Sequence, residues 1–231
     1  PIIFDFKHLS LLLGRETDYL ASVVNSPDSH YRFFNIKKRN GGTREICVPF
    51  PALLEMQYWI LDNILKPIKI HSSAHGFVQK KSILTNANLH LGQQQLLKLD
   101  LKDFFPSIEI NRIIHVFKSL GYPNQISFYL ARICSYNNHL PQGAPTSPML
   151  SNIISRTLDS RLMKFCKFYK LKYTRYADDL VFSGERIPFK FTEYISDIIS
   201  DQGFVVNESK TTLYQQNGRR IITGISVSSG A

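Results

Sequence analysis

Two adjacent carboxylates, Asp178 and Asp179, stand in a short turn between two largely apolar stretches of the sequence. Like charges placed side by side repel each other unless a cation lies close to them. Carboxylate oxygens are the ligands that hard divalent cations prefer in proteins, so this pair predicts a metal site. An ordinary aspartate-rich turn is the alternative, because aspartate favours turns in any protein.

A third carboxylate, Asp100, stands much earlier in the chain and strengthens the metal hypothesis. Leu97 and Leu99 alternate with Lys98 and Asp100. This is the pattern of a half-buried strand, so we expect Asp100 on its open face. If that strand neighbours the turn, the acids can hold two Mg²⁺ ions about 3.5–4 Å apart. Such a pair of ions serves the in-line displacement of a phosphoryl group.

The composition indicates a polyanionic partner. The 231 residues carry a formal charge of +10, from 28 lysines and arginines against 18 aspartates and glutamates. Cationic side chains that neutralise phosphates release counterions, which favours nucleic acid, although solubility alone is the alternative. No apolar run reaches the ~20 residues of a membrane span, and the N-terminal residues lack the basic-then-apolar pattern of a signal peptide, so we expect a cytoplasmic protein without membrane contact.

The segments around the three acids alternate between strand and helix patterns. Strands are expected over 31–36, 44–48, 96–101, 171–176, 180–182 and 204–206, the first two joined by a basic tip over 37–42. Helices are expected over 4–20, 51–65, 147–164 and 191–201, with a further one after an N-cap at Ser107. In the helix over 51–65, the expected buried face is Leu54, Tyr58, Leu61 and Leu65. This order favours an α+β fold with an antiparallel sheet packed on helices.

Three stretches resemble the core motifs of reverse transcriptases, in the order in which that family carries them. They are LKLDLKDFFPSI over 97–108, LPQGAPTSP over 140–148 and YADD over 176–179. The resemblance implies a right-hand polymerase fold with fingers over 1–95 and a palm over 96–220 that contains inserted fingers elements. Residues 221–231 would then be the palm end or the start of the thumb, which is expected to be largely absent from this chain.

The same resemblance implies roles for individual residues. Asp100, Asp178 and Asp179 match the catalytic, metal-binding triad, and the backbone carbonyl of Leu101 would be a further metal ligand. The implied cofactors are two Mg²⁺ ions, with Mn²⁺ as a substitute. The implied activity is RNA-directed DNA synthesis, with an RNA template, an RNA–DNA hybrid and dNTPs as partners.

Further residues match the family's nucleotide-binding positions. Phe105 matches the aromatic gate that excludes a ribonucleotide 2′-hydroxyl, and Gln142 matches a polar contact to the incoming nucleotide. Lys37 and Arg44 match the pair that clamps the triphosphate. Lys210 resembles the candidate general acid for pyrophosphate.

Two more segments resemble signatures of the bacterial retron subgroup. Residues 86–90, NANLH, fit its Asn-Ala-x-x-His pattern, and residues 222–224, ITG, resemble its Val-Thr-Gly pattern. The resemblance implies that the RNA-binding residues include Asn86, His90, Thr223 and Gly224. It also implies a cognate structured noncoding RNA, a branched RNA–DNA product, and antiphage defence with a possible effector protein. A core role for His90 and a helix cap at Asn86 are the alternatives.

Other classes of protein remain open at this stage. Group II intron, diversity-generating and defence-associated reverse transcriptases share much of this pattern. An RNA-dependent RNA polymerase would share the palm, but Phe105 argues against it. A catalytically silent RNA-binding scaffold is a non-enzymatic alternative, although clustered, unused carboxylates would repel a polyanion. A nuclease would also use clustered acids but would not explain Gln142.

Overall fold

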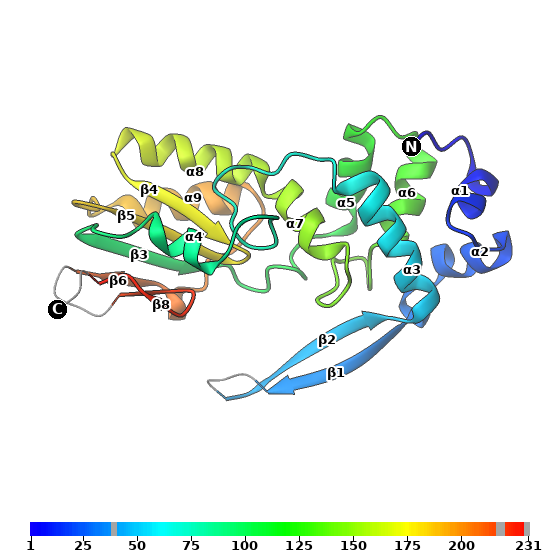
Figure 1. Cartoon of the computed structure of the whole chain (residues 1–231), viewed down its shortest axis with the longest axis horizontal. Coiled ribbons are helices and arrows are strands. Elements are labelled where there is room, and N and C mark those ends of the chain that lie inside the picture. Colours follow the sequence, from blue (N-terminus) through cyan, green and yellow to red (C-terminus); the bar gives the residue numbers. More distant parts are fainter. Residues whose placement is uncertain (38–40, 216–219, 229–231) are drawn as a thin grey trace. The chain divides into compact units, whose positions relative to one another are not determined.

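The computed structural model describes residues 1–37, 41–215 and 220–228 (Figure 1). The chain divides into two compact units, each built from two separate stretches of sequence. The first unit comprises Pro1–Lys69 and Phe105–Ile154, and the second comprises Ile70–Phe104 and Ser155–Ala231. Residues 70–95 fall in the second unit because α4 packs with the strands of that unit. The expected boundary between fingers and palm at residues 95 and 96 stays a prediction.

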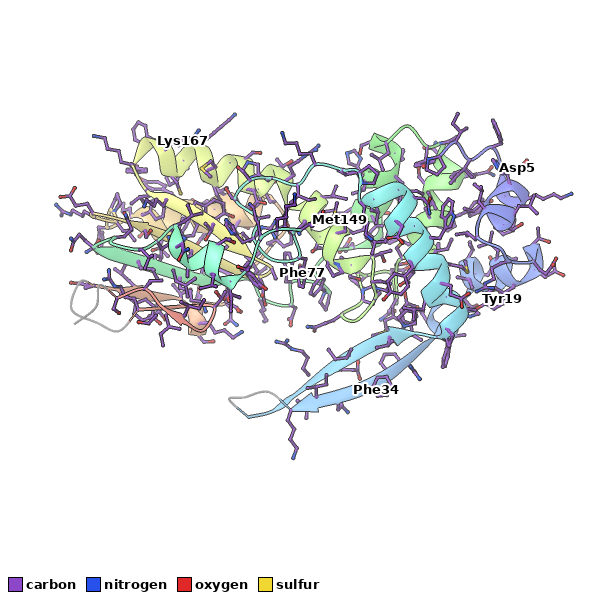
Figure 2. The ribbon with its side chains drawn as sticks, in the orientation of Figure 1. Asp5, Tyr19, Phe34, Phe77, Met149 and Lys167 are labelled. Carbon is purple, nitrogen blue, oxygen red and sulfur yellow. The ribbon has the colours of Figure 1, made fainter. Side chains whose placement is uncertain are left out.

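The first unit is a cluster of helices that carries a two-stranded antiparallel ribbon. Its helices are α1 (Phe6–Leu12), α2 (Thr17–Asn25), α3 (Pro51–Ile60), α5 (Ile110–Ser119), α6 (Asn124–Ile133) and α7 (Ser147–Ile154), with a 3₁₀ turn over Pro27–His30 and a π-helical turn over Leu61–Leu65. The ribbon consists of β1 (Tyr31–Lys37) and β2 (Thr43–Pro49). Figure 2 shows the side chain of Phe34 on this ribbon. The guanidinium of Arg32 lies 5.2 Å from the centre of the Phe34 ring.

Three expectations for the first unit were wrong in detail. The helix expected over 4–20 is divided into α1 and α2 near Gly14, whose φ of +63° leaves the helical region. The helix α5 has Glu109 as its N-cap in place of Ser107, because the preceding residues form turns. The face expected to be buried over 51–65 is buried only in part: Leu65 is fully buried, but Tyr58 is 50% exposed. The residues that α3 buries are Leu53, Met56, Gln57 and Ile60. Both sets have helical spacing, so the pattern alone could not choose between them.

The second unit is a four-stranded antiparallel sheet with helices packed on it. The strands are β3 (Gln95–Asp100), β4 (Lys172–Tyr176), β5 (Asp179–Gly184) and β6 (Thr212–Tyr214), in the order β4-β5-β3-β6. The other elements are α4 (Ile83–Asn88), α8 (Arg156–Phe168), α9 (Phe191–Asp201), a 3₁₀ turn over Glu208–Lys210, and the hairpin of β7 (Ile221–Ile222) and β8 (Ile225–Ser226). The expected α+β fold with an antiparallel sheet is confirmed.

Two expected elements of this region differ from the observed ones. The helix expected over 147–164 is interrupted at Ser155, so that α7 and α8 are separate helices assigned to different units. The strand expected over 204–206 is reduced to an isolated bridge between Val206 and Leu101. Backbone pairing at this point is therefore limited to the end of β3.

The register of the sheet assigns its side chains to two faces. Leu97 lies opposite Phe182, and the ring of Phe182 contacts Phe191 of α9, so this face is covered by helices. Leu96, Lys98 and Asp100 alternate onto the other face. On this face, α4 and the β7–β8 hairpin cover one end of the sheet. Their contact with the sheet is a buried cluster of Ala87, Leu96, Val181, Ile222 and Val227. Asp100 is only 7% exposed, so the open face expected for it was wrong.

Within the described residues, no helix combines the length and the apolar character needed to cross a bilayer. Cys47, Cys134 and Cys166 are all buried as free thiols. Buried free thiols of this kind behave as small apolar core side chains.

Candidate active site

The turn that carries Asp178 is short and strained. Tyr176 pairs with Asp179 across β4 and β5, so the turn itself consists of Ala177 and Asp178. Ala177 has a φ of +56°. A positive φ at the first turn residue alone is the pattern of a type II′ turn, where glycine is usual. An alanine in this conformation costs about 1–2 kcal/mol, so the surrounding structure must hold the turn in place.

The end of β3 is tied to both residues of the Asp-Asp pair. Asp100 lies directly opposite Asp179 in the register of β3 and β5. The backbone N–H of Leu101 donates a hydrogen bond to the carbonyl oxygen of Asp178 at 2.9 Å. The three acids, which are far apart in sequence, therefore belong to one end of the sheet, within the second unit.

The electrostatics of these acids reflect their mutual proximity. Burial raises the pKa of Asp178, and the charges of Asp179 and Asp100 raise it further. Burial also raises the pKa of Asp179, although Lys98 opposes that shift by charge and hydrogen bond. A raised pKa means that the ionised carboxylates are disfavoured in the folded protein, so the cluster attracts cations.

Two lysines already supply positive charge at the cluster. The Nζ atom of Lys98 lies 3.2 Å from a carboxylate oxygen of Asp179. The Nζ atom of Lys210 donates to both oxygens of Asp100, at 2.9 and 3.0 Å. The hydrogen bond to Asp100 is the main reason that the pKa of Lys210 is raised. Asn207 also donates through Nδ2 to Asp100, at 3.2 Å.

The sequence motifs predicted a role for Lys210, but not the contacts of Lys98 and Asn207 with the carboxylates. A signal for Lys98 was present, because a residue two positions before Asp100 in a strand shares its face. No sequence signal identified Asn207, since its contact depends on how the chain after α9 returns to β3.

The donor set suits a hard divalent cation, because the carboxylates supply only oxygen. Across residues 1–37, 41–215 and 220–228, however, no three Asp, Glu, His or Cys side chains are grouped closely enough to hold one ion as they stand. The ammonium groups of Lys98 and Lys210 contact two of the three carboxylates. The carboxylates are therefore chemically suitable metal ligands. For a metal ion to bind, the ion pairs of Lys98 with Asp179 and of Lys210 with Asp100 must break.

The expected triphosphate clamp lies in the first unit, on the β1–β2 ribbon. Lys37 pairs with Thr43, and Arg44 pairs with Ile36. Successive side chains of a strand alternate between faces, so this register places Lys37 and Arg44 on opposite faces of the ribbon. The remaining basic tip, residues 38–40, lies outside the described part of the chain.

The loop that contains Gln142 also belongs to the first unit and lies against β2. The carbonyl oxygen of Gln142 accepts a hydrogen bond from the N–H of Cys47 at 2.8 Å. A Cβ atom on Gly143 would come within 2.7 Å of the Cys47 carbonyl oxygen, and Gly143 has a φ of +133°. Only glycine permits this close approach. Phe105 is partly buried in the same unit. Its role as a gate stays a prediction.

The three residues that match the retron-like pattern over 86–90, Asn86, Ala87 and His90, are buried. His90 is 1% exposed, and its ring nitrogens Nδ1 and Nε2 lie 2.6 Å from the Ser183 hydroxyl and 2.8 Å from the Thr174 hydroxyl. A direct RNA contact by His90 is therefore corrected to a core role. Asn86 lies inside α4, whose N-cap is Ser82, so the helix-cap alternative for Asn86 was wrong. The Asn86 side chain is fully buried, and neither of its amide atoms has a hydrogen-bond partner among the described residues.

The second retron-like segment packs against the first. Ile222 shares the buried cluster with Ala87 of α4. Thr223 and Gly224 form the turn of the β7–β8 hairpin, with φ values of +46° and +87°. Two positive φ values define a type I′ turn, which a β-branched residue such as Thr223 adopts with strain. The Thr223 hydroxyl is buried, with no hydrogen-bond partner in the described structure.

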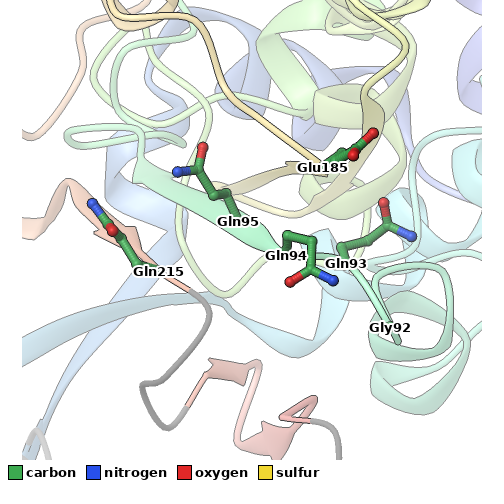
Figure 3. Close-up of a pocket in the computed structure, with 6 residues that line it drawn as sticks. All are labelled: Gly92, Gln93, Gln94, Gln95, Glu185 and Gln215. Carbon is green, nitrogen blue, oxygen red and sulfur yellow. The ribbon is translucent and has the colours of Figure 1, made fainter.

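A polar hollow lies at the end of β3 that is remote from Asp100 (Figure 3). Its lining residues are Gly92, Gln93, Gln94, Gln95, Glu185 and Gln215. None of the residues expected to act in catalysis or nucleotide binding lines it. The carboxylate cluster is therefore the candidate active site, and this hollow is separate from it.

Comparisons with known proteins agree with this geometry. Residues 36–225 match the family described as reverse transcriptase (RNA-dependent DNA polymerase). The chain is 36% identical to the retron Ec86 reverse transcriptase of Escherichia coli, over 99% of this chain and 72% of that protein. It is 35% identical to the retron Mx65 reverse transcriptase of Myxococcus xanthus, over 86% of this chain and 51% of that protein.

Solved structures show the same fold at low identity. A truncated apo telomerase of Candida tropicalis matches with a TM-score of 0.56 and 17% identity, over 87% of this chain and 53% of that one. A telomerase of Candida albicans in complex with a fragment of telomeric RNA matches with a TM-score of 0.59 and 12% identity, over 86% of this chain and 45% of that one. The chain thus spans about half the length of these proteins.

An antiparallel sheet that carries three acids at one end, together with the family match, defines the class of this protein. The chain belongs to the reverse transcriptase family, the RNA-directed DNA polymerases. Within that family it is a bacterial retron-type reverse transcriptase. Both expectations drawn from the sequence motifs are confirmed.

Proposed function

We propose that this chain is the polymerase core of a retron enzyme that copies an RNA template into DNA from dNTPs with two Mg²⁺ ions. The observation that carries the proposal is the direct pairing of Asp100 with Asp179 beside the strained turn of Asp178. These three carboxylates, with the carbonyl of Leu101, would hold the ions, and Mn²⁺ would substitute. When bound, the ions lower the pKa of the primer hydroxyl and stabilise the leaving pyrophosphate.

Lys210 is the proposed proton donor to the pyrophosphate. Its contact with Asp100 raises its pKa, so the ammonium group keeps its proton in the structure described. Loss of that contact lowers the pKa again, which favours transfer of the proton to a nearby phosphate oxygen. Lys98 of β3 makes a corresponding ion pair with Asp179.

The nucleotide contacts proposed for the first unit concern base, sugar and triphosphate. Phe105 would lie beneath the sugar, where its ring leaves no room for a 2′-hydroxyl. Gln142, on a loop that only glycine allows to approach β2, would contact the nucleotide. Arg44 and Lys37 would bind phosphate oxygens through charge-assisted hydrogen bonds. Because Lys37 and Arg44 lie on opposite faces of the ribbon, we expect them to bind different phosphates, or to act one after the other, rather than to form one clamp.

A specific structured RNA is the proposed partner of the two retron-like segments. The Thr223–Gly224 turn is strained, and the Thr223 hydroxyl and the Asn86 amide have no hydrogen-bond partner in the described residues. A strained turn and buried polar groups without partners call for an explanation, and a rearrangement of the Thr223–Gly224 turn on RNA binding is the one proposed. His90 would support this surface from the core. A cytoplasmic location is proposed from the sequence pattern, and a part in antiphage defence with an effector protein rests on the retron resemblance alone.

The test uses the full-length enzyme with the nucleic acid that copurifies with it. We expect one RNA from its own locus, Mg²⁺-dependent dNTP incorporation, and a DNA joined to the RNA through a 2′-linkage that a debranching enzyme cleaves. Thr223→Ala should weaken priming on this RNA more than extension of a supplied primer. RNA binding without dNTP incorporation would instead identify the silent scaffold, and unbranched DNA would contradict the retron product alone.

A further inference from the structure

A fully buried ion pair lies beneath the turn of the Asp-Asp motif. Arg175 of β4 and Asp159 of α8 both have 0% exposed side chains. The guanidinium of Arg175 makes a bidentate contact with the carboxylate of Asp159: Nε donates to Oδ1 at 2.9 Å, and Nη2 donates to Oδ2 at 2.7 Å. The hydroxyl of Tyr173 donates to the same Oδ1 atom at 2.8 Å. Every atom of the Asp159 carboxylate is thereby fixed.

A third nitrogen of Arg175 reaches the turn itself. Its Nη1 atom donates a hydrogen bond to the carbonyl oxygen of Ala177 at 3.2 Å. That carbonyl belongs to the peptide unit that joins Ala177 to Asp178. Because a peptide unit is planar, fixing this oxygen fixes the direction in which the Asp178 backbone departs.

The backbone of Arg175 is held as firmly as its side chain. Its N–H donates to the carbonyl of Ser73 at 2.8 Å, and its carbonyl accepts from the N–H of His75 at 2.7 Å. A Cβ atom on Gly76 would lie 2.6 Å from the backbone nitrogen of Ala177. The segment over 73–76 therefore packs against the backbone of the turn at Ala177, and the Arg175 side chain contacts the turn at the Ala177 carbonyl.

Arg175 cannot itself contact a substrate bound at the carboxylates. It pairs with Leu180 in the register of β4 and β5, whereas Tyr176 pairs with Asp179. Side chains alternate along a strand, so Arg175 points to the helix-covered face and Asp179 to the other. Any effect of Arg175 on the reaction must pass through the turn.

Stability alone does not account for this arrangement. Replacing a buried ion pair by apolar side chains of similar volume is often neutral or stabilising. The guanidinium differs from any apolar side chain because it offers several N–H donors in a rigid plane. Here two of them are oriented by Asp159, which leaves the third directed at the Ala177 carbonyl.

We propose that Arg175, oriented by Asp159, is a positioning residue that fixes the strained Ala177–Asp178 turn and thereby sets the affinity of the carboxylate cluster for divalent metal ions. This inference rests on the proposed two-metal function. Residues that orient metal ligands typically contribute 10–100-fold to metal affinity.

The main variant removes the whole network, so that no buried charge is left alone. It combines Arg175→Met, Asp159→Leu and Tyr173→Phe. A matched control makes the same type of change at the exposed pair of α8 and α9, Arg161→Met with Asp201→Leu, whose N–O distance is 2.8 Å. A second variant, Arg175→Lys, keeps the buried charge but loses the planar set of donors.

The readouts are thermal unfolding, Mn²⁺ binding to the full-length enzyme followed by electron paramagnetic resonance without nucleotide, and the Mg²⁺ dependence of dNTP incorporation. We expect the triple variant to unfold within a few degrees of the parent while its Mn²⁺ affinity falls about 10-fold or more. The Mg²⁺ concentration for half-maximal rate should rise by a similar factor, with most of kcat recovered at saturating Mg²⁺. The control should match the parent.

Arg175→Lys decides the question if the triple variant does not fold. A folded Arg175→Lys protein with weakened Mn²⁺ binding supports the positioning role, because a stably folded core with an intact charge would otherwise bind metal normally. Parent-like Mn²⁺ affinity in either folded variant overturns it. Absence of Mn²⁺ binding in the parent would overturn the two-metal function together with this inference, so the two failures are distinguishable.

Discussion

Asp100 and Asp179 lie directly opposite each other on β3 and β5, and each is contacted by its own lysine, Lys210 and Lys98. Side chains at directly opposed positions of an antiparallel pair are close neighbours on one face. Two carboxylates in such a position would destabilise the sheet without compensating charge. The lysines supply that charge, which explains how the fold holds an acidic cluster at the end of a largely apolar sheet.

Asp178→Asn should separate stability from catalysis. Burial and the charges of Asp179 and Asp100 raise the pKa of Asp178, so its ionised form destabilises the folded state at neutral pH. The neutral amide should therefore raise the Tm, while dNTP incorporation falls about 100-fold or more because a metal ligand is lost. Primer extension, an RNA-binding titration and thermal unfolding check this. Near-normal turnover in the variant would contradict the role of Asp178.

Gly76→Ala should damage the turn of the Asp-Asp motif. The new Cβ atom would meet the backbone nitrogen of Ala177 at 2.6 Å, and backbone cannot move aside cheaply. Overpacking of this kind costs about 1–3 kcal/mol, and we expect a parallel loss of primer extension. The control is Gly184→Ala, where the close contact is the end of the flexible Leu171 side chain. Equal effects of the two substitutions on activity would contradict the special position of Gly76.

His90 should make the fold sensitive to acid. Burial, together with the smaller effects of the nearby charges of Lys172 and His75, lowers the pKa of His90 to about 3. The unfolded chain binds a proton at His90 near pH 6.5, so between pH 6.5 and 3 the unfolded state holds more protons. The stability due to neutral His90 is thus present above pH 6.5 and is lost as the pH falls. At pH 5 the loss is about 2 kcal/mol.

Urea unfolding at pH 7.5 and pH 5 measures this dependence. His90→Gln should reduce the difference between the two free energies of unfolding. It should not abolish the difference, because the buried His75 has a pKa of about 4 and acts in the same direction. His115→Gln, at an exposed position, is the control. An identical pH dependence in the parent and in His90→Gln would show that the imidazole of His90 is not held neutral.

Phe105→Val should relax the selection of the sugar. The smaller side chain leaves room beneath the 2′ carbon, so ribonucleotides should be incorporated more readily relative to dNTPs. The measurement is kcat/KM for a dNTP and for the matching rNTP in variant and parent. Phe104→Leu, at a neighbouring position that is 4% exposed, is a control for general loosening of the core. An unchanged ratio in Phe105→Val would make Phe105 an ordinary packing residue.

The sequence by itself was sufficient for the class of the protein and for the elements that carry the three acids. Motif order is a property of the chain, and strand alternation around Asp100 reports a local periodicity. Helix faces and caps were less certain, as Tyr58 and Ser107 illustrate. Both choices depend on which neighbours a helix packs against, and periodicity does not contain that information.

Only the tertiary structure decided how these parts act on one another. No local pattern could reveal that Asp100 faces Asp179, that Lys98 and Asn207 contact the cluster, or that Arg175 holds the Ala177 carbonyl. Nor could it reveal that His90 is a core residue bound to Ser183 and Thr174. Each relationship joins residues that are brought together by strand register or helix packing. Register is set by long-range pairing and by which face the core covers, so it is a property of the folded sheet rather than of any one segment.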